Sequence, residues 1–148
     1  MNYRISKLRE YLLGIIETLA KSKYPINADM LDNDVNHYSL DKIPTDTKVE
    51  KWIIGTEIHR DLFSFRSRRN YSQDTIDNLK NIGFFEDFEQ LINSNNEKGI
   101  LPDIENIESI QCMNCGTLNY ADTNTAEFDI QIQITYRDYE KREVSLWK

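Results

Sequence analysis

The chain has only two cysteines, Cys112 and Cys115, and they stand as C-x-x-C directly before a glycine. This spacing is typical of one half of a tetrahedral zinc site. His37 and His59 are the only histidines and form no closely spaced pair, so such a site would need every cysteine and histidine of the chain. Residues three apart in a continuous strand point to opposite faces, which argues against a shared metal. A small zinc-binding interaction module using Cys112 and Cys115 stays open as an alternative.

Two short motifs begin like known catalytic or metal-binding loops but are incomplete. Residues 59–62, HRDL, begin like the catalytic loop of protein kinases, but Arg66 stands where that loop needs a magnesium-binding Asn. We therefore expect a strand whose polar residues face water. Residues 32–43 begin like a calcium loop, but His37 replaces the required glycine and Ile43 replaces the required glutamate. This segment is therefore expected to be an acidic turn.

Sequence signatures of catalysis are missing from the chain. It contains no G-x-S-x-G elbow, no phosphate-binding P-loop and no Cys–His nucleophile pair of recognisable spacing. Its carboxylates are numerous but scattered, and none of them forms an evident acid–base couple. We therefore expect a protein that is not an enzyme and that holds no catalytic residue, cofactor or metal.

The densest basic cluster consists of Arg66, Arg68 and Arg69 in the segment RSRRNYS, which also contains Tyr71. The composition of this segment predicts a connector between secondary-structure elements. Arginine and tyrosine are enriched at protein interfaces, and guanidinium groups bind the carboxylates or phosphates of a partner. The four residues are therefore the candidate contact with a neighbouring subunit or partner. The alternative is a solvated connector that lies beside the protein's own carboxylates.

The composition indicates a single domain over residues 1–148. A chain of 148 residues can bury a sizeable core. Its net charge of −7 is unsuited to gripping a phosphate backbone, which needs surplus Lys and Arg. No apolar run is long enough to span a membrane, and the charged N-terminus lacks the apolar centre of a signal peptide. We therefore expect synthesis and retention in the cytoplasm, with no membrane contact.

Hydrophobic periodicity predicts the elements that must position these residues. Apolar residues at three- and four-residue spacing predict amphipathic helices over 3–21 and 72–99. Residues 35–44 are the expected extended piece between the helices, and residues 49–65 are expected to form a bent strand or a hairpin that pivots at Gly55.

The C-terminal part of the chain carries the clearest strand pattern. Residues 126–137 alternate strictly between apolar and polar side chains, which is typical of a long strand with one face on a core. A turn cluster precedes this strand, so 107–120 and 125–138 are expected to form an antiparallel hairpin. The order of elements predicts an α+β fold: an antiparallel sheet of about four strands with two helices packed on one face.

The ordered features resemble a family of small proteins from long-tailed bacteriophages and prophages, the tail-terminator or minor capsid proteins. The similarity lies in KWIIGTEIHRDLFSFRSRRNYSQDTIDNLKNIGFFEDFEQLI and IESIQCMNCGTLNYADTNTAEFDIQIQITY, and it covers most of the chain from about residue 35 onward. It consists of packing patterns without a catalytic signature. The matching positions are Gly55, Phe63, Phe65, Ser67, Arg68, Tyr71, the segment GFFEDFEQLI, and residues 107–110, 116–118 and 126–131.

This resemblance implies a structural virion protein of the tail or neck, made in the bacterial host cytoplasm. Such proteins cap the tail tube as a ring, usually a hexamer, which stops tube polymerisation and forms the joint to the head-side connector. The implied partners are other copies of the chain, the tube protein (with sheath protein in a contractile tail) and connector proteins. Genomic DNA would pass through an acidic lumen without specific binding. A neck or head-completion connector subunit is the alternative within the same class.

Overall fold

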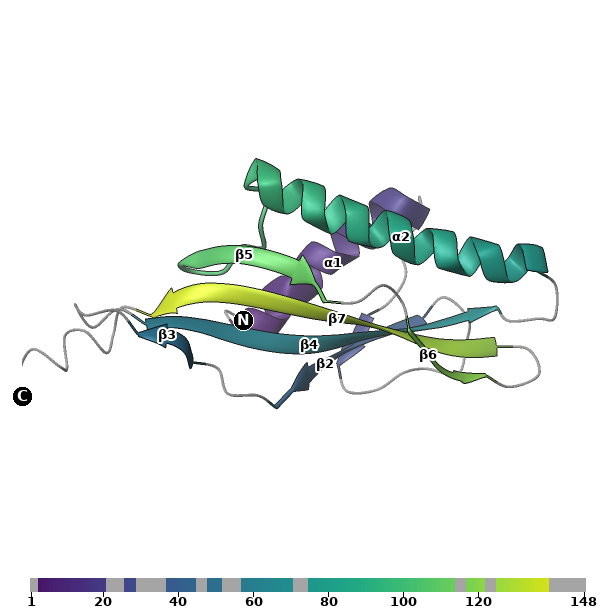
Figure 1. The fold of residues 1–148 in the computed structure, drawn as a ribbon, viewed down its shortest axis with the longest axis horizontal. Helices are drawn as coiled ribbons and strands as arrows, with labels where there is room; N and C mark the ends of the chain where they lie inside the picture. The colour runs from purple at the N-terminus through teal and green to yellow at the C-terminus, as the bar shows by residue number, and fades with distance from the viewer. Residues whose placement is uncertain are drawn as a thin grey trace, which may run out of the picture.

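The computed structural model describes residues 3–20, 26–28, 37–44, 48–51, 57–70, 75–113, 117–121 and 125–138. These residues form two helices and a seven-stranded sheet (Figure 1). No described helix is long and apolar enough to cross a membrane. The elements are α1 (Arg4–Ala20), β1 (Ile26–Ala28), β2 (His37–Ile43), β3 (Lys48–Lys51), β4 (Glu57–Asn70), α2 (Thr75–Lys98), β5 (Ile107–Cys112), β6 (Thr117–Ala121) and β7 (Thr125–Asp138).

The sheet is built around the two longest strands, β4 and β7, which pair antiparallel over 14 residues each. β2 and β3 lie one after the other along the outer edge of β4, and β5 and β6 lie one after the other along the outer edge of β7. All of these pairs are antiparallel, so they form the predicted four-stranded width. β1 adds a short parallel edge to β2.

Both helices contact the same face of this sheet, as Figure 1 shows. Phe88 of α2 stacks on Phe65 of β4 with ring centroids 5.3 Å apart, and Arg4 of α1 contacts Asp61 of β4. Asp61 and Phe65 are four residues apart in one strand, so their side chains point to the same side. The predicted α+β fold with an antiparallel sheet is confirmed.

The core lies between the helices and this face of the sheet. The predicted apolar stripe of α1 and the alternating face of β7 are both buried there, because each element has one apolar side to remove from water. Its fully buried members include Leu8, Leu12 and Ile16 of α1, Tyr38 and Leu40 of β2, Phe63 and Phe65 of β4, Phe85, Phe88 and Ile92 of α2, and Ile130, Ile132 and Ile134 of β7.

The end of α2 follows from its sequence. Gly99 adopts a positive φ of 75°, a conformation that favours glycine. The Gly99 amide then donates to the Asn96 carbonyl at 3.2 Å, and the Ile100 amide donates to the Asn95 carbonyl at 2.8 Å. These two bonds satisfy carbonyls that the helix leaves unpaired. They explain why the helix ends in the segment where the sequence predicts its end.

One prediction about strand boundaries is wrong. Residues 66–70 are not a connector, because they continue β4 and pair with 125–129 of β7. The expected arm over 107–120 contains β5 and β6, which both pair antiparallel with β7 as the hairpin prediction requires, and residues 114–116 lie outside the described residues. The hairpin interpretation of 49–65 agrees with the antiparallel pairing of β3 and β4, while Gly55 lies outside the described residues.

Candidate functional site

The face of the sheet opposite the helices carries a row of half-buried, mostly polar side chains. Along β4, residues 57, 59, 61, 63, 65 and 67 are buried towards the helices, whereas residues 58, 60, 62, 64, 66 and 68 are half-buried on the opposite side. Neither of the described helices covers that side (Figure 1). We call this surface the open face.

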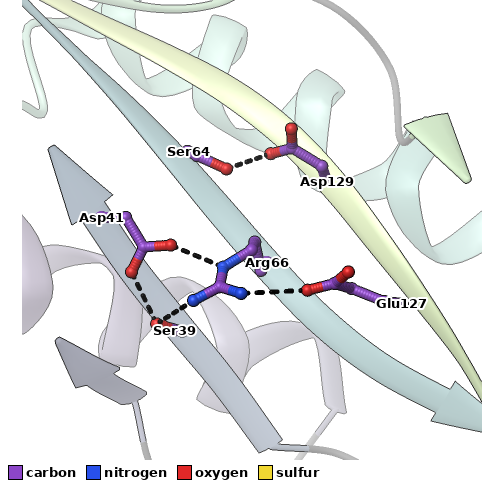
Figure 2. Close-up of polar contacts among 6 residues, drawn as sticks. All are labelled: Ser39, Asp41, Ser64, Arg66, Glu127 and Asp129. Carbon is purple, nitrogen blue, oxygen red and sulfur yellow. Dashed lines mark hydrogen bonds and ion pairs between the residues drawn. The ribbon is translucent and has the colours of Figure 1, made fainter. Parts of the chain in front are cut away.

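Arg66 stands at the centre of a polar network on the open face (Figure 2). Its Nε lies 2.5 Å from Asp41 Oδ2, and its Nη1 donates to Glu127 Oε1 at 3.1 Å. Ser39 accepts a longer bond of 3.4 Å from Nη2 and itself donates to Asp41 Oδ1 at 2.8 Å. The network therefore joins β2, β4 and β7 across the middle of the sheet.

The electrostatics of this network keep Arg66 charged. Its partial burial by itself lowers the pKa, but the hydrogen bonds and charges of Asp41 and then Glu127 outweigh that effect, so the pKa of Arg66 is raised above its ordinary value. A guanidinium held between two carboxylates of its own chain is a structural clamp. This arrangement matches the alternative that the basic cluster lies beside the protein's own carboxylates.

The four predicted interface residues are not gathered into one described surface. Arg66 pairs within the chain, as above. Arg68 is half-buried on the open face, opposite Glu127 in the β4–β7 ladder, and it also has an interaction partner. The backbone of Arg69 lies in β4, opposite Ala126 of β7. Tyr71 lies outside the described residues.

A second group of charged residues lies on the helix side, at the N-terminal end of β4. Glu57, His59 and Asp61 are only 2%, 8% and 1% exposed. His59 Nε2 lies 3.6 Å from Glu57 Oε2, and the His59 ring packs against Tyr136 at 5.7 Å. The expectation that polar residues of the HRDL segment face water is therefore wrong for His59 and Asp61.

Asp61 is the most strongly engaged acid of this group. It accepts a hydrogen bond of 2.6 Å from Arg4 Nε at its Oδ2, while the Arg4 guanidinium lies 4.4 Å from the centre of the Tyr136 ring. Lys42 Nζ lies 3.7 Å from Asp61 Oδ1, which is buried and accepts no hydrogen bond. Asp61 thus anchors the first turn of α1 to the sheet.

The burial of these polar residues follows from the alternation along the strand. Glu57, His59 and Asp61 have the same alternation as Phe63 and Phe65, whose large apolar side chains must point to the core. A strand that buries the phenylalanines must also turn the three polar residues inward. The alternation could therefore have predicted their burial, whereas Arg4, the partner of Asp61, comes from a distant helix that this pattern does not place.

A hollow of about 320 Å³ opens beside Asp61, between the first turn of α1 and the strands β2 and β4. Two cations stand at its wall together with apolar side chains, so it can receive a side chain that combines an apolar stem with a polar end. Its lining residues are Tyr3, Arg4, Ile5, Lys42, Asp61 and Phe63.

The cysteine pair falls at the break between β5 and β6. Cys112 is the last residue of β5 and packs against the core, while Cys115 lies outside the described residues. The argument against a shared metal, which places both cysteines in one continuous strand, therefore concerns a residue outside the described ones. Among the residues that the structure describes, no group of three or more His, Cys, Asp or Glu side chains is arranged to hold a metal.

Comparison of the chain with models of protein families and with curated protein sequences gives no match in either case.

Proposed function

We propose that the protein is a structural virion protein that closes the end of a phage tail tube as a ring. In this role it stops tube polymerisation and forms the joint to the head-side connector. The observation that carries the proposal is the open face: a long antiparallel sheet covered by helices on one side and, among the described elements, by nothing on the other. The resemblance of the sequence to tail-terminator proteins supports the same role.

The size of the open face suits a stable contact with another protein. β4 and β7 have 14 residues each. At roughly 3.3 Å per residue and roughly 4.8 Å between strands, a width of four strands gives an area of about 900 Å². A stable protein–protein contact buries about 800 Å² on each partner. The open face is therefore large enough for a contact with a neighbouring subunit or with the tube.

Charge pairing on the open face supports the same use. Arg66 is neutralised by Asp41 and Glu127, and Arg137 donates a hydrogen bond to Glu108. Burying an unpaired charge costs more than burying a charge that is already paired and hydrogen-bonded within its own chain. A partner can therefore cover these paired residues without supplying opposite charges to them.

A nonsense codon in the gene of the phage or prophage that carries this chain tests the proposal. Without the cap, tubes are expected to grow past their normal length and to remain separate from filled heads. Electron microscopy of lysates measures both effects. Tails of normal length joined to heads would contradict the proposal. A neck connector, the alternative in the same class, predicts tubes of normal length that fail to join heads.

A small zinc-binding interaction module is the second candidate, because Cys112 lies at the end of β5 and begins a C-x-x-C motif with Cys115. Metal analysis of the purified protein separates the two proposals. The module requires one zinc ion per chain, and replacing Cys112 and Cys115 by serine would abolish both the zinc and partner binding. The ring protein requires no zinc for assembly.

A further inference from the structure

We propose that the hollow beside Asp61 receives an acidic side chain from α2 of a second copy of the chain. This inference rests on the proposed ring, and it names the two surfaces that meet where neighbouring subunits touch. A ring needs two different, complementary patches on each subunit, because identical patches pair two subunits and then stop.

The hollow offers more positive than negative charge. The side chains of Arg4 and Lys42 are 42% and 50% exposed, and both lie beside the single carboxylate of Asp61, which is 1% exposed. Arg4 donates a hydrogen bond to Asp61 Oδ2, whereas Lys42 is too distant to donate one to Asp61 Oδ1. Glu57, on the same side of β4, is four residues along the strand from Asp61, roughly 13 Å away.

The walls of the hollow favour a side chain over a free ion. Ile5 and Phe63 give it an apolar lining, and Tyr3, which is 66% exposed, stands at its mouth. Anchor residues at interfaces typically enter well-packed pockets from which water is excluded. An Asp or Glu side chain fits this lining, because its stem contacts the apolar wall while its carboxylate reaches the ammonium of Lys42.

The matching acidic patch lies on α2. Glu86 and Asp87 are adjacent and exposed in the middle of the helix, and neither forms an ion pair within the part of the chain that the structure describes. Asp103 lies 3.8 Å from Lys7 and is placed differently. Glu86 and Asp87 are neighbours in the chain, so they offer two exposed negative charges to one cationic partner.

Charge reversal tests this pairing. Lys42→Glu, and separately Glu86→Lys with Asp87→Lys, are expected to lower subunit association on the order of tenfold. The protein that carries all three substitutions is expected to recover most of the association, because the charges again oppose each other. Lys98→Glu is the matched control, since Lys98 is an exposed lysine away from the hollow.

Association is measured by mass photometry in solution and by electron microscopy on purified tail tubes, after circular dichroism has verified folding. If Lys42→Glu fails to fold beside Asp61, Lys42→Gln removes the charge without reversing it, and a weaker loss of the same sign is expected. If the charge-reversed variants associate as well as the wild type does, the inference alone is overturned. The same holds if the triple variant associates no better than the variants from which it is built. Wild-type protein that forms no ring in either assay would overturn the proposed function as well.

Discussion

At the scale of single residues, Arg66 shows how one side chain can stabilise a sheet across three strands. Its sequence neighbours predict a basic connector, yet Arg66 lies in a strand and pairs with Asp41 of β2 and Glu127 of β7. The side chains of the three residues are 26%, 20% and 18% exposed, so water screens their charges only partly. Removing the guanidinium would leave two half-buried carboxylates close together.

Arg66→Ala is therefore expected to lower the free energy of unfolding by about 1–3 kcal/mol, between the values for an exposed and a fully buried ion pair. Urea denaturation followed by circular dichroism measures the change. Arg9→Ala, at an exposed position on α1, is the matched control and should cost less. Equal losses for the two variants would show that the network contributes nothing specific.

Tyr11 gives the protein a pH dependence at high pH. Burial raises the pKa of Tyr11, the charge of Cys112 raises it further, and the hydrogen bond from Asn95 lowers it, with a net rise above the ordinary value of about 10. Its hydroxyl donates to the Ile100 carbonyl at 2.8 Å, which requires the protonated form. The folded state therefore holds this proton more tightly than the unfolded state does.

Because the folded pKa is the higher one, the stabilisation is fully present below pH 10 or so and is lost as the pH rises through the folded pKa. Tyr11→Phe removes this contribution. The difference in unfolding free energy between wild type and Tyr11→Phe, measured by urea denaturation at several pH values from 8 to 11.5, should shrink as the pH rises. The other tyrosines titrate in both proteins and cancel. A difference that stays constant with pH would contradict this assignment.

At the scale of elements, the C-terminal end of α2 protects an edge strand. The amide of Met113 donates to the Gln131 carbonyl at 2.7 Å, and alternation along the antiparallel ladder then turns the Ile110 amide away from β7. The Asn96 side chain accepts a hydrogen bond of 3.1 Å from that amide. An edge strand with unpaired amides is a template for pairing with another chain, so this bond closes β5 to such pairing.

Asn96→Ala is expected to speed hydrogen exchange at the Ile110 amide by about tenfold, because a bond worth roughly 1 kcal/mol or more is lost. NMR detection of amide exchange measures the rate for that single residue. Asn93→Ala is the control, since Asn93 is exposed on the same helix. Unchanged protection of Ile110 in Asn96→Ala would mean that the surrounding packing, and not the side-chain bond, shields the edge.

The elements with strong internal patterns could be predicted from sequence, and contacts between distant elements could not. The alternation of β7 and the apolar stripe of α1 repeat over many residues, so a single odd residue does not obscure them. Residues 66–70 were mistaken for a connector because three arginines outweighed the alternation that continues from Phe63 and Phe65. The pairing of Arg66 with Glu127, and of Arg4 with Asp61, depends on which strands and helices become neighbours, which local patterns do not contain.

At the scale of the whole molecule, charge is divided between the two sides. On the helix side the exposed acids include Glu86, Asp87 and Glu97, and these account for part of the net charge of −7. On the open face, Asp41 and Glu127 both pair with Arg66, and Glu108 pairs with Arg137. One side thus carries exposed acids that a cationic partner can contact, and the other carries charges that are paired within the chain.

The most direct test of the proposed ring locates the protein on a growing tail tube. Protein carrying a gold-labelled tag is added to tubes of the same phage during assembly, and the tubes are imaged by negative-stain electron microscopy. A ring that caps the tube should appear as label at one end of each tube, in a closed ring, and labelled tubes should stop growing. Label scattered along the tubes, or tubes that continue to grow unlabelled at the same rate, would contradict the proposed ring.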